Sequence, residues 1–439
     1  MDITELTKTL HEKINSATST QEVLALSKAI ERLNIGSVRT VATYTDLADL
    51  FVLNGEVIFV EDEEALYFNV LGIAWKKITE SGAVVVRTWG SGTSGPLGDG
   101  TTTAKSSPVS VVGGFIDWIQ VSANGTHVIG LRDNGTVWTW GSNSGGQLGD
   151  GTTTSRSSPG SVVGGFTDWI YVAAGRNHTF GIRSNNTLWA WGNNTSGRLG
   201  DNTTAAKSSP VSVVGGFTDW TQATGGYSHS IGIRANGTAW AWGSGGTGNL
   251  GNSSFGDFSS PVSVVGGFTD WTRVSAGSGH SVGLRANGTV WSWGYNVQGQ
   301  LGINATNARA SPTSVVGGFT NWVFVDTVAN HTIGLLSDGT AWTWGVNAAG
   351  QLGDGTTTNR SSPVSVVGGF TDWVQVTAGF QHSIAVRANS NAWAWGNNGA
   401  GRLGDGTTVG KSSPVSVVGG ITNWIEVHGA DTNSAGLTV

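Results

Sequence analysis

The chain has 439 residues, with 69 Gly, 21 Trp, no Cys and only 12% charged residues. Without cysteine it can form neither a disulfide framework nor a thiolate metal site. Residues 1–80 carry 7 Lys/Arg against 13 Asp/Glu, whereas residues 81–439 balance 16 against 16. The larger part therefore has no basic field with which to bind nucleic acid.

The N-terminus shows neither the basic start nor the apolar run of a signal peptide. No stretch approaches the roughly 18 apolar residues that a membrane-spanning helix needs. These features predict a soluble protein that is not exported by the usual route and does not insert into a membrane.

Two short amphipathic helices are expected in the first 34 residues. Apolar side chains recur at helical spacing along residues 3–16, and a capping box at Ser19 and Glu22 opens a second helix that ends near Asn34. Helices this short are marginal alone, so each apolar stripe needs a partner surface. We interpret residues 1–34 as an anchor or oligomerisation segment, with these contact residues: Leu6, Leu10, Ile14, Val23, Leu26, Ile30 and Leu33.

Residues 35–80 predict a small β-module. Strand-like runs at 55–60, 65–69 and 73–78 are joined in part by the acidic stretch Glu61–Glu64. We interpret this stretch as a solvated turn rather than a metal site.

From residue 81 onward the chain repeats every 51 residues without a slip. The dipeptide Trp-Gly marks the period, with its tryptophan at Trp89, Trp140, Trp191, Trp242, Trp293, Trp344 and Trp395. A period of this size indicates a repeat architecture, in which no single unit can bury its own apolar face.

One repeat, residues 107–157, reads as four strands. They are expected at 107–112, 115–121, 127–132 and 137–141, and Asn134-Gly135 is a strong hairpin signal. Four strands per unit predict a propeller blade, so residues 81–439 form an all-β, seven-bladed β-propeller. The last copy stops before its Trp-Gly strand and the first copy has only that strand, at 84–90. We therefore expect the ring to close by pairing of N- and C-terminal strands, which removes open sheet edges.

The run from His280 to Gly302 resembles the repeat of the regulator of chromosome condensation, RCC1. It reads His-x-x-Gly-Leu-Arg-x-Asn-Gly-Thr-x-Trp-x-Trp-Gly-x-Asn-x-x-Gly-Gln-Leu-Gly. The resemblance covers residues 81–439 and implies a seven-bladed propeller. It does not imply one function, because the family includes nucleotide exchange factors, ubiquitin ligase modules, a secreted β-lactamase inhibitor and phage proteins.

Comparison of the seven copies predicts a recurring ion pair within the blade. An aspartate precedes an arginine by 15 residues in five copies, and both partners change together in the other two, to Asn321 with Leu336 and to Asn423 with Thr438. Shared ancestry of the copies is the alternative explanation. The predicted pairs are Asp117–Arg132, Asp168–Arg183, Asp219–Arg234, Asp270–Arg285 and Asp372–Arg387.

Two other recurring sets suggest metal ligands, and we reject both. Equivalent atoms in adjacent blades lie too far apart for metal bonds of about 2 Å, so we expect the recurring histidines to be buried and bonded to neighbouring backbone, with Asn433 imitating them in the seventh copy. Asp99, Asp150, Asp354 and Asp405 each offer one carboxylate, whereas calcium takes six to eight oxygens, so turn chemistry explains them. The histidines are His127, His178, His229, His280, His331 and His382.

Two sets of residues are candidates for binding. The first is a ring of basic residues before the Ser-Pro strand, which is either a set of solvated loop charges or a collar for an anionic glycan or partner protein. The second lies in the variable loops that precede each histidine, where Arg176, Tyr227 and Phe380 suit a recognition surface. Relaxed selection explains that variation equally well. The basic ring consists of Lys105, Arg156, Lys207, Arg309, Arg360 and Lys411, with Phe258 in the remaining copy.

No catalytic set, phosphate-binding loop, cofactor site or metal site emerges, so we expect a protein that is not an enzyme and carries no cofactor. The helix Glu22–Leu33 and the run Gly55–Tyr67 resemble N-terminal segments of fibre-like virion proteins of marine phages. That resemblance implies a virion structural protein, a tail or head fibre or a capsid decoration. Its first 80 residues would contact other virion proteins and favour a trimer, and its propeller would bind a glycan or protein of the host surface.

Two alternatives remain. One is a cytoplasmic RCC1-family adaptor or nucleotide exchange factor, although an exchange factor is expected to use a wedge for which the constant period leaves no room. The other is a bacterial surface adhesin or inhibitor, which would need an export signal.

Overall fold

The computed structural model describes residues 83–439 and, ahead of them, the backbone of four short strands. The chain divides into two compact units, Met1–Ala83 and Val84–Val439. In the first unit β1 (Arg39–Val41) runs parallel to β2 (Val57–Val60), which pairs antiparallel with β3 (Ala65–Val70), and β3 pairs antiparallel with β4 (Ala74–Lys77). The expected helices and their anchor residues lie outside the described residues. In the part described, no helix is long and apolar enough to cross a membrane.

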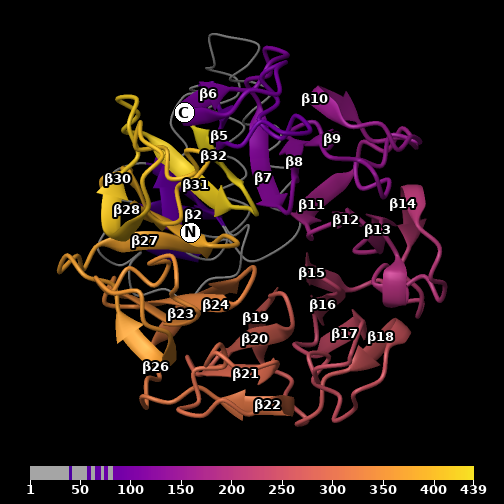
Figure 1. The fold of residues 1–439 in the computed structure, drawn as a ribbon. Coiled ribbons are helices and arrows are strands. Elements are labelled where there is room, and N and C mark those ends of the chain that lie inside the picture. The colour runs from indigo at the N-terminus through magenta and orange to yellow at the C-terminus, as the bar shows by residue number, and fades with distance from the viewer. Residues whose placement is uncertain (1–38, 42–56, 61–64, 71–73, 78–82) are drawn as a thin grey trace. The chain divides into compact units, whose positions relative to one another are not determined.

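The second unit is a seven-bladed β-propeller, each blade a four-stranded antiparallel sheet (Figure 1). The strand order follows the chain in every blade but the last, whose order is β31-β32-β5-β6. One 3₁₀ turn, η3 (Thr195–Gly197), interrupts a loop of blade 2. Blade 1 contains β7 (Trp118–Asn124), β8 (His127–Arg132), β9 (Val137–Gly141) and β10 (Arg156–Ser161); blade 2 contains β11 (Trp169–Ala174), β12 (His178–Arg183), β13 (Leu188–Gly192) and β14 (Lys207–Ser212); blade 3 contains β15 (Trp220–Gly225), β16 (His229–Arg234), β17 (Ala239–Gly243) and β18 (Phe258–Ser263); blade 4 contains β19 (Trp271–Ala276), β20 (His280–Arg285), β21 (Val290–Gly294) and β22 (Arg309–Ser314); blade 5 contains β23 (Trp322–Thr327), β24 (His331–Leu336), β25 (Ala341–Gly345) and β26 (Arg360–Ser365); blade 6 contains β27 (Trp373–Ala378), β28 (His382–Arg387), β29 (Ala392–Gly396) and β30 (Lys411–Ser416); blade 7 contains β31 (Trp424–Gly429), β32 (Asn433–Thr438), β5 (Val85–Gly90) and β6 (Lys105–Ser110).

The ring closes as the sequence predicts, by pairing of strands from opposite ends of the repeat region. The grouping of strands differs from the prediction, because the Ser-Pro strand is the outermost strand of one blade and not the first strand of the next, so the N-terminal end contributes both β5 and β6. Strand β5 is antiparallel to β32, with Asn433 opposite Gly90 and Thr438 opposite Val85. Because β5 also pairs with β6, blade 7 is built from both chain ends and no blade lacks a strand. The prediction of a closed seven-bladed propeller is therefore confirmed.

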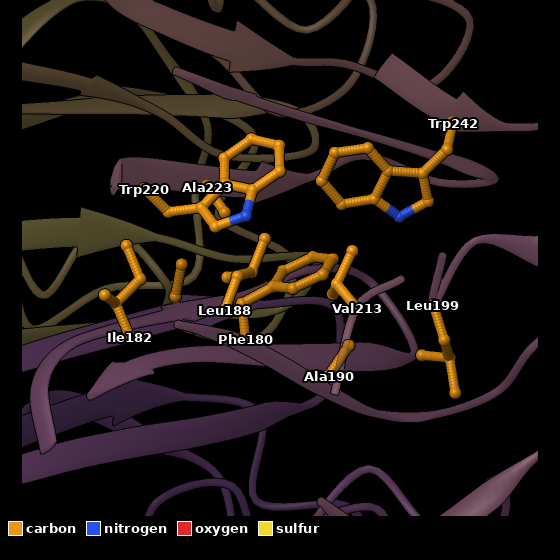
Figure 2. Packing of buried hydrophobic residues seen from close by; sticks show 10 residues of the cluster. Phe180, Ile182, Leu188, Ala190, Leu199, Val213, Trp220, Ala223 and Trp242 are labelled. Atoms are coloured by element: carbon orange, nitrogen blue, oxygen red, sulfur yellow. The ribbon is translucent and has the colours of Figure 1, made fainter. Parts of the chain in front are cut away.

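The apolar core lies between adjacent blades. Figure 2 shows one such layer, in which Phe180, Leu188 and Val213 of blade 2 face Trp220 and Trp242 of blade 3. The two indoles meet at 5.8 Å between ring centroids in an edge arrangement. Each of the two indoles lies on the buried face of its strand, because alternate residues of a strand point to the same side. Each blade thus buries its tryptophans only when its neighbour is present.

The Trp-Gly tryptophan also joins the blades through a hydrogen bond. Trp242 Nε1 donates to the carbonyl oxygen of Arg198 in blade 2, at 2.9 Å. Gly200, two residues later, has a φ of +72° and no side chain, and a Cβ there would lie 2.8 Å from Trp242 Nε1. The recurring Leu-Gly of each repeat is therefore explained by the indole that packs on it.

Replacing Trp242 by Ala should lower the free energy of unfolding by about 3–5 kcal/mol, because a large side chain leaves a buried cavity. Trp240, two residues earlier on the same strand, is only partly buried against the same layer. Trp240→Ala is the matched control and should cost less. Urea unfolding followed by circular dichroism compares the two variants, and equal costs would contradict this account of the core.

Candidate functional site

The first strand of each blade lies next to the axis, and its end leads into a short loop that we call an inner loop. The first strands neighbour one another around the ring. Backbone hydrogen bonds tie successive inner loops, for example from Arg176 N to Gly226 O at 3.2 Å and from Phe380 N to Ala430 O at 3.0 Å. Strand direction places all seven loops at one end of the axis, which we call the inner-loop face. The loops comprise residues 125–126, 175–177, 226–228, 277–279, 328–330, 379–381 and 430–432.

The structure brings together the three variable-loop residues singled out from the sequence, and adds a fourth. Arg176 Nε donates to Asp431 Oδ2 at 2.8 Å, and its guanidinium carbon lies 3.8 Å from the ring centroid of Tyr227 and 5.7 Å from that of Phe380. These four residues come from blades 2, 3, 6 and 7. We call them the axial cluster.

Two buried arginines support the axial cluster from below. Arg198 Nη1 donates to the carbonyl oxygen of Tyr227 at 2.8 Å, and Arg402 Nη1 donates to that of Asp431 at 2.9 Å. The backbone of both loops is thereby fixed, while the Tyr227 side chain remains 43% exposed. An exposed aromatic ring on a fixed backbone is suited to recognition, because little conformational entropy is lost on binding.

Asp431 is not among the residues predicted from the sequence, although the sequence contains a signal for it. Among the seven inner loops Arg176 is the one basic residue and Asp431 the one acidic residue. They belong to blades 2 and 7, so the side chain of Arg176 reaches past the loop of blade 1. That loop has Gly125 at a φ of +58°, where a Cβ would lie 2.0 Å from the carbonyl oxygen of Arg176. Glycine is therefore needed there for the approach.

Next to the inner loops, polar side chains at one position of the first strands link neighbouring strands in six of the seven blades, and Phe324 is the exception. Gln120 illustrates the contact, since its Nε2 donates to Val172 O and its Oε1 accepts from Val172 N, both at 3.0 Å. Tyr171 and Arg273 occupy equivalent positions and bond to the next strand through Ala223 O and Val325 O. Burial raises the pKa of Tyr171 to about 12 and lowers the pKa of Arg273. Six of the seven positions of this ring are thus polar, and in blade 5 the guanidinium of Arg273 lies over the ring of Phe324 instead.

The six histidines are fully buried and connect adjacent blades. His127 Nε2 lies 2.9 Å from Thr179 Oγ1 of the next blade, and Thr179 in turn donates to Gln147 O at 2.7 Å. Since the one hydroxyl proton goes to that carbonyl, the histidine must donate through Nε2. The expectation that the rings bond to backbone was therefore wrong: their partner is a hydroxyl. The remaining pairs are His178–Ser230, His229–Ser281, His280–Thr332, His331–Ser383 and His382–Ser434.

Asn433 does not imitate the histidines, contrary to expectation. Neither its Oδ1 nor its Nδ2 has a hydrogen-bond partner. The position that would supply the hydroxyl, 52 residues on around the ring, is Val128, which packs with Ala430 and Ala435 instead. Both halves of the contact are therefore replaced together at the junction of blades 7 and 1. Among the described residues, no group of His, Asp and Glu is arranged to hold a metal ion.

The ring of basic residues lies on the outermost strands, away from the axial cluster, and four of its six members form ion pairs. Each pairs with an aspartate six residues earlier: Lys105–Asp99 at 3.7 Å, Arg156–Asp150 at 3.1 Å, Lys207–Asp201 at 3.6 Å and Arg360–Asp354 at 2.7 Å. Lys411 lies close enough to Asp405 to help lower the pKa of that carboxyl. The basic ring therefore does not present a collar of free positive charge.

The aspartates of these pairs also organise their own turns. Asp150 Oδ1 accepts from Thr152 N at 3.0 Å and from Thr152 Oγ1 at 2.7 Å. Burial alone would raise the pKa of Asp150, but the hydrogen bonds from Thr152, Arg156 and Asn143 outweigh it and hold the pKa below its ordinary value. The same Asx-type turn recurs at Asp99, Asp354 and Asp405.

The five predicted acid–base partners lie within ion-pair distance in every case. Arg234 Nε is 2.8 Å from Asp219 Oδ1, and the guanidinium carbon lies 4.0 Å from the ring centroid of Phe217. The other four separations are 2.7 Å for Asp117–Arg132, 2.9 Å for Asp168–Arg183, 2.8 Å for Asp270–Arg285 and 2.8 Å for Asp372–Arg387.

A double-mutant cycle on Asp219→Ala and Arg234→Ala should give a coupling of about 0.5–1 kcal/mol, the range of partly exposed pairs. The measurement is the urea dependence of unfolding for the wild type, both single variants and the double variant. Combining Arg234→Ala with Asp168→Ala, whose carboxylate belongs to another blade, should be additive and serves as the control. Additive effects of Asp219 and Arg234 would show that the pair contributes nothing.

The propeller matches a known protein family. The model of the RCC1-like domain matches residues 85–435. The chain belongs to the RCC1-like family. The ultraviolet-B receptor UVR8 of Arabidopsis thaliana is 28% identical to it over 368 residues, which cover 80% of this chain and 82% of that protein. The human E3 ubiquitin-protein ligase HERC2 is 30% identical over 298 residues, 65% of this chain but only 6% of HERC2.

Solved structures of RCC1-type propellers superpose on it as well. Prp20p from Saccharomyces cerevisiae matches with a TM-score of 0.74 and 21% identity over 82% of this chain and 92% of that one. Human WBSCR16 matches with a TM-score of 0.72 and 18% identity, over 81% and 99%. At these identities the likeness concerns the fold alone.

Proposed function

We propose that this chain is a binding scaffold without catalytic activity, an adaptor of the RCC1-like family that recognises a protein partner through its inner-loop face. The observation that carries the proposal is the axial cluster. Arg176, Tyr227, Phe380 and Asp431 come from four blades and meet around one guanidinium. Arg and aromatic side chains dominate the energetics of protein interfaces, and here they lie on fixed loops.

The relatives support a binding role for this type of propeller. The report on the Prp20p structure describes the binding of that protein to Gsp1p and histones. UVR8 is named as a receptor, and HERC2 as a ubiquitin ligase much longer than the matched region. An exchange activity is not favoured, because the 51-residue spacing holds through every blade and no protruding segment interrupts it. The virion role rests on the N-terminal residues, most of them outside the described part, and stays a prediction.

Substitution of the axial cluster tests the proposal. In affinity purifications from cells that express the full chain natively, Arg176→Ala with Tyr227→Ala should reduce the recovery of specific partners by about tenfold or more, as loss of two central contacts does. Thr221→Ala with Thr272→Ala is the control, since both residues are exposed at the other end of first strands. If the Arg176 and Tyr227 variant retained its partners and the Thr221 and Thr272 variant lost them, the assignment of the binding face would be refuted. Thermal melts establish that both variants are folded.

A further inference from the structure

A second surface departs from the internal symmetry of the ring, on the outer edge of blades 3 and 4. In five blades this edge carries the aspartate and the basic residue described above. In blade 3 they are replaced by Asn252 and Phe258, and in blade 4 the aspartate alone is replaced, by Ile303. The two exceptions are neighbours in the ring, where β18 and β22 are the outermost strands (Figure 1).

Loss of the aspartate leaves Arg309 without an anionic partner. Among the described residues Arg309 forms no ion pair, and the one hydrogen bond of its side chain is a long one from Nη1 to Ala308 O, at 3.3 Å. Asp257, an acid of the neighbouring loop, accepts instead from Gly245 N at 3.0 Å and Ser244 Oγ at 3.2 Å. A partly exposed guanidinium with free donors favours a carboxylate as its ligand.

Apolar side chains replace small and polar ones beside this guanidinium. Phe255 is 60% exposed and Val297 is 61% exposed. In the other six copies the position of Phe255 is threonine, and the position of Val297 is Gly, Ala, Ser or Thr. The six threonines are Thr102, Thr153, Thr204, Thr306, Thr357 and Thr408. Because the other six copies fold without them, these two exposed apolar side chains are not required by the fold, and they lie on the same edge as the unpaired guanidinium.

These residues belong to segments that pack together. Ser253 N, in the loop that carries Phe255, donates to Ala310 O at 2.8 Å, so this loop lies against the residue that follows Arg309. Gly294, at the start of the loop that carries Val297, is the register partner of Arg309 in blade 4. Phe258 packs on the apolar layer between blades 3 and 4. We call Phe255, Phe258, Val297 and Arg309 the rim patch.

We propose that the rim patch is a second docking surface, which takes a protein segment presenting an acidic side chain among apolar ones. The apolar residues would pack on Phe255 and Val297, and the carboxylate would pair with Arg309 in place of the missing aspartate. The surface is separate from the inner-loop face, so the chain would be able to join two partners.

Restoring the pattern of the other repeats tests this proposal without disturbing the fold. The variant N252D/F255T/F258K/I303D re-creates both ion pairs and removes the exposed ring. Fluorescence anisotropy of the full chain is measured with three short labelled peptides: one of alternating Leu and Glu, one with Lys in place of Glu, and one with Ser in place of Leu. The wild type should bind the Leu/Glu peptide about tenfold more tightly than the other two, with affinity falling at high salt. The restored variant should lose this preference.

Thr357→Phe is the matched control, because it exposes a phenylalanine in blade 5 beside the intact pair of Asp354 and Arg360. The Thr357→Phe variant should bind the Leu/Glu peptide with the affinity of the wild type, because the rim patch remains its one binding surface for this peptide. Three outcomes would overturn the proposal. The peptides could bind equally well, the restored variant could retain the preference, or light scattering could show that the wild type, but not the restored variant, self-associates through this patch.

Discussion

Acidification from about pH 6.5 to about pH 4.5 should destabilise the propeller steeply, before most of its carboxylates are protonated. Burial lowers the pKa of His127, His229 and His280 to about 3 and that of His331 to about 4. Burial also lowers the pKa of His178 and His382 well below the ordinary value. In the unfolded chain these histidines titrate near 6.5.

The direction of the effect follows from linkage. Between the two pKa values the unfolded chain binds more protons than the folded one, so the free energy of unfolding rises with pH. The contribution of these histidines is complete above about pH 6.5 and is lost as the pH falls toward their folded values. Each histidine contributes up to about 1.4 kcal/mol per pH unit, and six such groups together form the largest expected effect on stability.

Urea midpoints measured between about pH 7 and about pH 4.5 test this expectation. His229→Gln is the matched variant, because glutamine does not titrate while its amide can still donate toward Ser281. Its midpoint should be less sensitive to pH than that of the wild type. A midpoint that stays constant across this range would show that the histidines are not held neutral by the ring.

Removal of β5 should prevent formation of a stable ring. Deleting residues 1–90 removes every backbone pair between β5 and β32 and the buried indole of Trp89. Loss of one buried tryptophan costs about 3–5 kcal/mol, and the unpaired edges of β32 and β6 add to it, so the total reaches the whole stability of a typical domain.

Deletion of residues 1–82 is the control, since the propeller unit begins at Val84. It should leave a soluble protein with a single cooperative thermal transition, whereas the longer deletion should give aggregated or partly unfolded material. Calorimetry and size-exclusion chromatography distinguish the two. If both truncated chains melt alike, strand closure does not hold the ring together.

The sequence predicts contacts within one repeat well, because each copy is an independent observation of the same unit. The joint change of Asp and Arg to Asn321 and Leu336 indicates the recurring pair, and the truncated first and last copies indicate the closing strand. The same approach could have found the pairs six residues apart, such as Asp150 with Arg156, because Ile303 and Asn252 interrupt them.

Contacts that cross the axis are harder to predict. Arg176 and Asp431 are separated by 255 residues, which is five periods, so both occupy the same position of the repeat. The period places both on the inner-loop face, but it does not tell which of the seven equivalent residues meet across the axis. The hydroxyl partners of the histidines were missed for a related reason. Each pairs with a residue 52 positions later, and a one-residue offset from the period is invisible until the blades are seen side by side.

Hydrogen exchange on the full chain, alone and with a co-purified partner, tests the central proposal most directly. Binding through the inner-loop face should slow exchange of the amides in residues 175–177, 226–228, 379–381 and 430–432, and leave the hairpin turns at the opposite end unchanged. Protection confined to those hairpin turns, with the inner loops exchanging as in the free chain, would contradict it.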